Sequence, residues 1–141
     1  MSATDVAIEA TRAAAEAANN KMGKDIIAFD VSEQLAITDV FLVASAPNER
    51  AVGAIVDAIE ERLLRDGLKP VRREGDRENR WVLLDYLDVV VHVQHKEERE
   101  LYSLERLWRD CPRIELNLPE PPQAAEDEDD ELPTGFWNPD L

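Results

Sequence analysis

The chain has 141 residues, enough for one domain with a single hydrophobic core, and a formal net charge of −15. A chain this acidic repels phosphate backbones, which argues against direct binding of nucleic acid, and its single cysteine, Cys111, excludes an intramolecular disulfide or a four-cysteine zinc site. No apolar run approaches the ~20 residues of a membrane span and the N-terminus lacks a signal-peptide core, so we expect a cytoplasmic protein with no membrane partner.

The first half of the sequence predicts a helix, two strands and a second helix. Residues 2–20 form an alanine-rich helix whose shallow apolar face suits close packing against a sheet, with a loosely attached edge helix as the alternative. Residues 25–31 and 40–45 are nearly continuous apolar runs, as expected of strands that helices cover on both faces. Residues 47–66 place apolar side chains at helical spacing, and Gly67 is a plausible cap just past this helix.

The second half predicts three strands and a helix. Residues 71–74 form a short strand near a sheet edge, because two arginines interrupt it. Residues 81–93 contain two apolar strands around a tight joint, which predicts a hairpin. Beyond Lys96 the period becomes helical, and Pro112 stops the helix; its apolar positions are Leu101, Leu104, Leu107 and Trp108.

This order of elements predicts an α/β domain with a mixed β-sheet flanked by helices over residues 1–116. Residues 117–141 are rich in proline and contain eight acidic residues and no basic one, so residues 1–116 carry −7 of the total charge of −15. Such a segment cannot bury enough apolar area to offset its chain entropy, which predicts a disordered tail. The tail has three interpretations. It only solubilises the protein, or Phe136 and Trp137 near its end form a docking patch, or these two aromatic residues fold back onto the domain.

Two segments carry a resemblance to a known family. GKDIIAFDVSEQLAITDVFLVAS and RWVLLDYLDVVVHVQHKEERELYSLERLW resemble the ribosomal silencing factor family, also called the Iojap family, and the similarity covers roughly residues 7–113. The sequence departs from the family pattern at Leu87, where a hairpin glycine is usual, and at residues 46–48, which replace a turn rich in Gly, Ser and Thr. The resemblance implies a nucleotidyltransferase-like fold.

The resemblance also implies a function without catalysis. Family members repress translation by binding the large ribosomal subunit through its fourteenth protein, on the face that meets the small subunit, and so block subunit joining, especially under nutrient limitation. The family also suggests homodimers of the free protein. The acidic composition fits a basic ribosomal protein as the partner better than it fits RNA.

Aromatic residues gather in sequence around the predicted hairpin and last helix, which favours a protein interface there. Aromatic side chains dominate contact energies at interfaces, and carboxylates around them would form an acidic rim. A helical stripe is also typical of a core, so Trp108 and Leu104 have a second interpretation. The predicted partner-binding residues are Trp81, Asp85, Tyr86, Asp88, Tyr102, Glu105 and Trp108.

A nucleotide-using enzyme related to nucleotidyltransferases is the alternative function, and an adaptor whose acidic tail mimics nucleic acid is a third. Phosphoryl transfer needs carboxylates that converge on divalent cations and a backbone cradle for phosphates. Neither Asp85 with Asp88 nor Asp25 with Asp30 is spaced to converge, and no glycine-rich loop follows a strand. His92 and His95 fall on opposite faces of a strand. We therefore expect no catalytic residue, no metal site and no cofactor.

Overall fold

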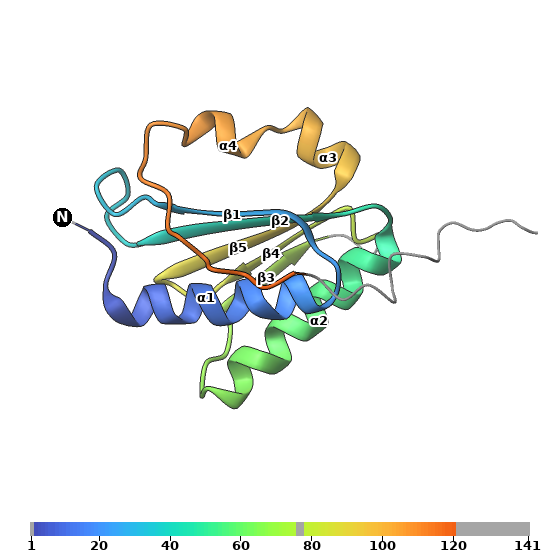
Figure 1. The fold of residues 1–141 in the computed structure, drawn as a ribbon, viewed down its shortest axis with the longest axis horizontal. Helices are drawn as coiled ribbons and strands as arrows, with labels where there is room; N and C mark the ends of the chain where they lie inside the picture. The colour runs from blue at the N-terminus through green and yellow to red at the C-terminus, as the bar shows by residue number, and fades with distance from the viewer. Residues whose placement is uncertain (1, 76–77, 121–141) are drawn as a thin grey trace, which may run out of the picture.

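The computed structural model describes residues 2–75 and 78–120 and contains a five-stranded mixed sheet between two layers of helices. Two long helices lie on one face of the sheet and two short helices lie over the other (Figure 1). The helices are α1 (Asp5–Asn20), α2 (Glu49–Arg65), α3 (Lys96–Leu101) and α4 (Leu104–Leu107), and the strands are β1 (Lys24–Asp30), β2 (Val40–Ala46), β3 (Arg72–Gly75), β4 (Trp81–Asp85) and β5 (Val89–His95). The predicted α/β class is confirmed.

The strand order is β1-β2-β5-β4-β3, so strands that are distant in sequence become neighbours. β2 pairs with β5 in parallel, whereas every other pair of adjacent strands is antiparallel. β4 and β5 form the predicted hairpin, and β3 is an edge strand, as its two arginines predicted. In the hairpin loop, Leu87 adopts a φ of +72°, the left-handed conformation that glycine adopts without steric cost.

The two long helices begin at side chains that accept a hydrogen bond from the first turn. Thr4 Oγ1 accepts from the Ala7 amide in α1, and Asn48 Oδ1 accepts from the Ala51 amide in α2. Each bond satisfies one of the amide groups that a helix N-terminus leaves unpaired. α2 ends with Gly67 just beyond it at a φ of +87°, which confirms Gly67 as the predicted cap.

The main hydrophobic core lies between the sheet and the α1–α2 layer. The alanine face of α1 packs closely, as the first of the two alternatives predicted, and Ala14, Ala15 and Ala18 are fully buried. α2 contributes larger side chains, among them Ile55 and Ile59, which are also fully buried. A smaller apolar cluster occupies the opposite face of the sheet; it contains Phe29, Val31 and Cys111, with Ile27, Leu35, Phe41 and Trp108 against it.

The prediction of one helix after Lys96 is wrong, because the segment breaks into α3 and α4 at Tyr102 and Ser103. Tyr102 has a φ of −112° and a ψ of 71°, outside the helical region. No residue of α4 is buried. Helical spacing fits this segment only as a local pattern, because Leu101 and Leu107 are exposed and do not pack on the sheet as one stripe.

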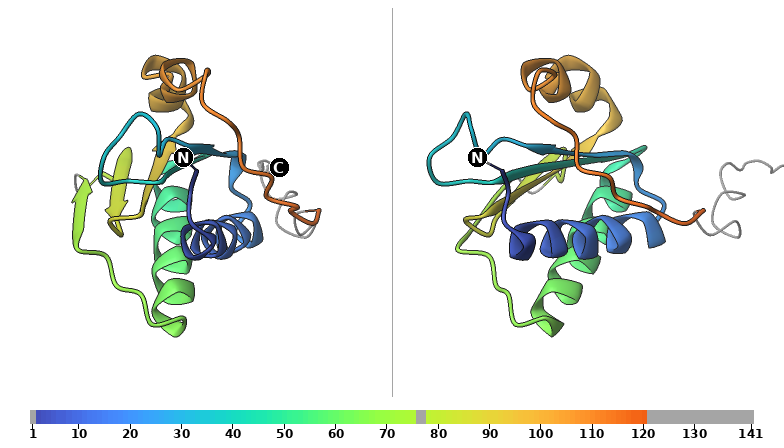
Figure 2. Two further views of the ribbon diagram at one scale, coloured as in Figure 1. Left: turned by 90° about the vertical axis from the view of Figure 1, so that its left-hand side faces the viewer. Right: turned by 60° about the vertical axis from the view of Figure 1, so that its left-hand side comes forward.

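After α4 the chain returns across the edge of the sheet to the α1 side (Figure 2). We call residues 112–119 the strap. Within it, the Ile114 amide donates to the Ala28 carbonyl of β1, and the Pro119 carbonyl accepts from Asn19 Nδ2 of α1. The described fold therefore includes residues 117–120, which were assigned to the predicted tail, while residues 121–141, with Phe136 and Trp137, lie outside the described residues. In the described part of the chain, no helix is long and apolar enough to cross a membrane.

Candidate functional site

The second face of the sheet carries the residues that the sequence singled out on β4. Val82 and Leu84 are buried in the main core beneath α1 and α2, and strand alternation turns Trp81, Leu83 and Asp85 to the other face. These three side chains are only partly buried. The hairpin therefore exposes its aromatic and acidic residues on the side of the sheet that the short helices α3 and α4 cover.

Five ring side chains form a continuous row across this face. Trp108 meets Phe41 edge-on at 5.2 Å between ring centroids, and Phe41 lies 5.2 Å from His92. His92 lies 6.0 Å from Trp81, which in turn lies 5.2 Å from Tyr102. All four separations fall within the range of favourable ring contacts. We call Trp108, Phe41, His92, Trp81 and Tyr102 the aromatic row.

The aromatic row joins four separate segments of the chain. Phe41 comes from β2, His92 from β5 and Trp81 from β4, while Tyr102 and Trp108 follow α3 and α4. The sequence predicted Trp81, Tyr102 and Trp108 as a group and missed Phe41. The only signal for Phe41 is its place in a buried strand, and the parallel pairing of β2 with β5 brings it to this position.

His92 sets the orientation of Trp81. Its Nδ1 accepts a hydrogen bond from Trp81 Nε1 at 3.2 Å, so a neighbouring side chain partners this nitrogen, as predicted, whereas Nε2 is buried without a hydrogen-bond partner in the described residues. His92 is only 6% exposed, and burial lowers its pKa to about 4. Because a neutral imidazole is needed to accept at Nδ1, the low pKa keeps the contact between Trp81 and His92 intact near neutral pH.

The exposed end of the aromatic row is apolar. Tyr102 is 49% exposed, and the leucines on either side of it, Leu101 and Leu107, are 72% and 69% exposed. Both leucines were predicted as apolar positions of one continuous helix, and that helix is instead broken between them. An exposed tyrosine with two exposed leucines is an apolar patch of the kind that marks an interaction site.

Arg99 holds the broken helix in place. Its Nε donates to both carboxylate oxygens of Glu105, at 3.1 Å and 3.0 Å, and its Nη2 donates to the Asp25 carbonyl at 2.7 Å. The guanidinium thus ties α3, α4 and the start of β1 together. Glu105, which was predicted to contact a partner, has its oxygens engaged inside the protein, and sequence reasoning missed Arg99 because nothing local marks a buried arginine.

An acidic cluster lies at the other side of Trp81. The Arg80 guanidinium binds three carboxylates, those of Glu49, Glu97 and Glu98, at 2.8 to 3.0 Å. One cation facing three anions leaves a net negative charge beside Trp81. Carboxylates from α3 and from the start of α2 thus gather near Trp81, but the predicted acidic residues Asp85, Asp88 and Glu105 are not among them.

Two predicted residues lie apart from the aromatic row. Tyr86 packs against the main core on the α2 side of the sheet, where burial raises the pKa of its hydroxyl to about 12. Asp88 is exposed in the hairpin loop, and its carbonyl accepts from the amides of Asp39 and Val40. Asp85 faces the correct side, but its carboxylate accepts from the Leu87 amide and lies 3.5 Å from Arg72.

The Asp30 carboxylate, one of those considered for metal chemistry, has a structural role. Asp30 accepts hydrogen bonds from the Ser32 hydroxyl and amide and from the Ala3 amide. Burial works to raise the pKa of Asp30, but these hydrogen bonds outweigh it and hold the pKa below its usual value. Across residues 2–75 and 78–120, no group of three or more His, Cys, Asp or Glu side chains is placed to hold a metal ion.

Comparisons with known proteins assign this chain to a family. The family model described as "Ribosomal silencing factor during starvation" matches residues 4–135. The ribosomal silencing factor of Bacillus subtilis is 40% identical over 105 residues, which cover 74% of this chain and 89% of the relative.

Solved structures agree with the sequence match. A crystal structure of a protein from Chromobacterium violaceum superposes with a TM-score of 0.69 at 36% identity, over 72% of this chain and 84% of the other. A crystal structure of a Bacillus halodurans protein gives a TM-score of 0.67 at 36% identity, over 77% and 98% of the two chains. The chain therefore belongs to the ribosomal silencing factor family, whose role is the ribosome-associated silencing of translation.

Proposed function

We propose that this protein represses translation by binding the fourteenth protein of the large ribosomal subunit with the aromatic row and the exposed residues Leu101 and Leu107. The bound protein would occupy the face that meets the small subunit and prevent subunit joining by its bulk. No bond is made or broken in this mechanism. Occupancy follows the concentration of the factor relative to its dissociation constant.

The observation that carries the proposal is the aromatic row itself, which ends in a half-exposed tyrosine between exposed leucines. Partly buried aromatic side chains that neighbours hold in fixed orientations lose little entropy on binding, and such residues dominate interface energies. Here Trp81 is oriented by His92, and Tyr102 packs against Trp81 with its ring tilted by 39°. The row thus forms a rigid apolar centre for a contact.

The charge around the row supports a basic protein as the partner. Arg80 is shared among three carboxylates, so the border of the row beside Trp81 is negative. Opposite charge on a partner raises the rate of association and fixes the orientation of the complex. Such a contact weakens as salt is added, because exposed charges separated by more than about 8–10 Å are screened at ionic strengths of 0.10–0.15 M.

Co-sedimentation with isolated large subunits tests the proposal. We expect Trp81→Ala and Tyr102→Ala each to weaken binding by about 30-fold, since an interface hot spot contributes roughly 2 kcal/mol. Leu64→Ala is the matched control, because Leu64 is 54% exposed on α2, away from the aromatic row. Subunit association, followed by light scattering, should recover in the two aromatic variants and stay inhibited in the control.

Circular dichroism and thermal melting establish that the aromatic variants remain folded. If folded Trp81→Ala and Tyr102→Ala proteins bound large subunits as tightly as the unmodified protein, the aromatic row would not be the contact. If all variants bound normally but subunits still joined in their presence, the steric mechanism would be wrong while the binding site could stand.

A further inference from the structure

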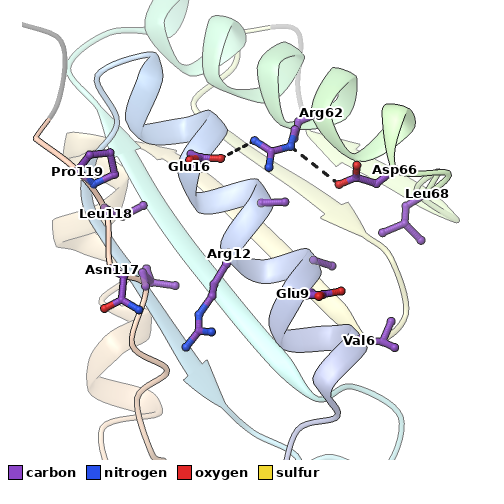
Figure 3. Close-up of a pocket in the computed structure, with 13 residues that line it drawn as sticks. Val6, Glu9, Arg12, Glu16, Arg62, Asp66, Leu68, Asn117, Leu118 and Pro119 are labelled. Atoms are coloured by element: carbon purple, nitrogen blue, oxygen red, sulfur yellow. Dashed lines mark hydrogen bonds and ion pairs between the residues drawn. The ribbon is translucent and has the colours of Figure 1, made fainter.

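A groove of about 500 Å³ lies on the side of the molecule opposite the aromatic row. Figure 3 shows that it runs over the outer surface of α1, between the C-terminal end of α2 and the strap. A groove of this size is within the ~300–1,000 Å³ of pockets that enclose apolar groups. Its apolar lining residues are Val6, Ala10, Ala13, Leu68, Leu116 and Leu118.

The apolar floor of the groove belongs to a second face of α1. Ala7, Ala14 and Ala18 are buried against the rest of the fold, whereas Val6 and Ala10 line the groove. Val6 is 66% exposed. The sheet and α2 therefore cover only part of the apolar surface of α1. The remaining apolar surface is available for another segment to cover.

The charged rim of the groove has one cation available for a carboxylate. Arg62 binds Glu16 at 2.7 Å and lies 3.9 Å from Asp66. Arg12 donates through Nε to the Glu115 carbonyl, and in the described residues it forms no ion pair with a carboxylate. Its guanidinium can therefore bind an acidic group that approaches along the strap.

The course of the chain supplies a candidate occupant. The strap lines one wall of the groove and ends at Pro119, directly before the acidic C-terminal segment. After Trp108 the sequence contains only two aromatic residues, Phe136 and Trp137, and Asp140 follows them closely. The fifteen residues 121–135 span roughly 20 Å as a flexible chain, whereas α1, with its 16 residues, is about 24 Å long. The aromatic pair can therefore reach the whole groove.

We propose that Phe136 and Trp137 of the chain's own C-terminal segment dock in this groove, with Asp140 near Arg12. Each aromatic side chain can bury roughly 150–250 Å² of surface, which would cover the exposed part of α1. The docked segment would hold the acidic run 126–131 beside the α1–α2 layer and away from the aromatic row. This inference concerns a different face from the proposed function and can fail or stand independently of it.

Nuclear magnetic resonance of the full chain tests the docking. The three tryptophans give three indole N–H signals, which Trp→Phe variants assign. A nitroxide label on Glu9→Cys, at the rim of the groove, should abolish the Trp137 signal, and a label on Leu107→Cys, on the far side of the sheet, should leave it. Cys111 is 8% exposed and burial raises the pKa of its thiol, so the label attaches selectively to the introduced cysteine.

A second substitution separates docking from chance encounters of a tethered tail. Ala10→Arg fills the groove and should restore the Trp137 signal in the protein labelled at Glu9→Cys. Ala54→Arg is the matched control, because Ala54 is an exposed alanine of α2 outside the groove, and it should leave the signal abolished. Unchanged signals from core amides would establish that both variants are folded.

Three results would overturn the proposal. The first is a Trp137 signal that the label at Glu9→Cys does not affect, and the second is a signal that stays abolished in Ala10→Arg. The third comes from a mixture of ¹⁵N-labelled protein without nitroxide and unlabelled protein with nitroxide. Loss of the ¹⁵N Trp137 signal in that mixture would mean that the segment docks on a second copy of the chain.

Discussion

The two helical layers of this protein differ in what they bury. The α1–α2 layer covers its face of the sheet with fully buried apolar side chains, among them Ile55 and Ile59. The α3–α4 layer is formed by helices of 6 and 4 residues, and α4 buries none of its side chains. One layer supplies stability, and the other leaves part of a sheet face and its aromatic residues accessible.

The α3–α4 side also contains buried polar atoms that lack hydrogen-bond partners in the described residues. They are His92 Nε2, Trp108 Nε1, Arg99 Nη1 and both side-chain polar atoms of Gln94. A buried polar atom without a partner costs free energy. A layer with such atoms and few buried apolar side chains opens more easily than the α1–α2 layer. The candidate binding surface therefore lies on the half of the fold that opens more easily.

The largest expected effect is on the free energy of unfolding, and it distinguishes the two layers when one apolar side chain is truncated in each. Ile55→Ala, in the α1–α2 layer, should lower the free energy of unfolding by about 2–5 kcal/mol, because it leaves a cavity in the core. Leu101→Ala, in α3, should change it by less than about 0.5 kcal/mol, because that side chain is 72% exposed. Urea denaturation measures both values. Equal losses of unfolding free energy would contradict the inference that the α1–α2 layer supplies most of the stability.

A pH titration tests the aromatic row next. Burial lowers the pKa of His92 to about 4 in the folded protein, against about 6.5 in the unfolded chain. The unfolded chain therefore takes up a proton first as the pH falls, so the stability from neutral His92 is complete above pH 6.5 and declines toward pH 4. The decline should reach about 3 kcal/mol at pH 4.

The control for this titration is His92→Leu, which removes the titrating group but keeps an apolar side chain in the row. Denaturation with urea at pH 7, 5.5 and 4 should give a shallower decline for the variant than for the unmodified protein. Identical pH profiles for the two proteins would show that His92 is solvated in the folded state and that its contact with Trp81 does not depend on a neutral imidazole.

A smaller effect is expected from the buried arginine. Arg99→Met should lower the free energy of unfolding by about 1–3 kcal/mol, because the charge-assisted hydrogen bonds to Glu105 and Asp25 are lost. Hydrogen exchange should accelerate in residues 96–108 and stay unchanged in α1 and α2. Arg72→Met is the control, since that side chain is 60% exposed and should cost little. Faster exchange throughout the fold would mean that the two layers open together.

The spacing of apolar residues predicted most of the helices and strands, because each helix or strand has its own local repeat of apolar positions. The hairpin of β4 and β5 and the edge position of β3 followed from alternation and from the placement of arginines. The same period failed after Lys96, where leucines at helical spacing belong to two short helices and Leu101 and Leu107 are exposed. Spacing predicts which residues share a helix face, but tertiary contacts decide whether that face is buried.

Only part of the candidate site was predicted, because some of its contacts join segments that are distant in the sequence. Trp81, Tyr102 and Trp108 are close in sequence and were recognised together. Phe41 joins them only because β2 pairs with β5 in parallel, a contact between segments about 50 residues apart. Arg99 was missed because its contacts are with two other segments, α4 and the start of β1, and Tyr86 was included although it belongs to the opposite side of the sheet.

By itself, the amino-acid sequence determined the α/β class, the order of the elements, the acidic charge and the resemblance to ribosomal silencing factors, since these depend on local period, composition and motif. The tertiary structure alone decided the strand order, the break between α3 and α4 and the membership of the aromatic row. Each of these results from long-range packing, in which the free energy of burying a side chain depends on residues that are remote in the sequence and therefore cannot be inferred from its neighbours.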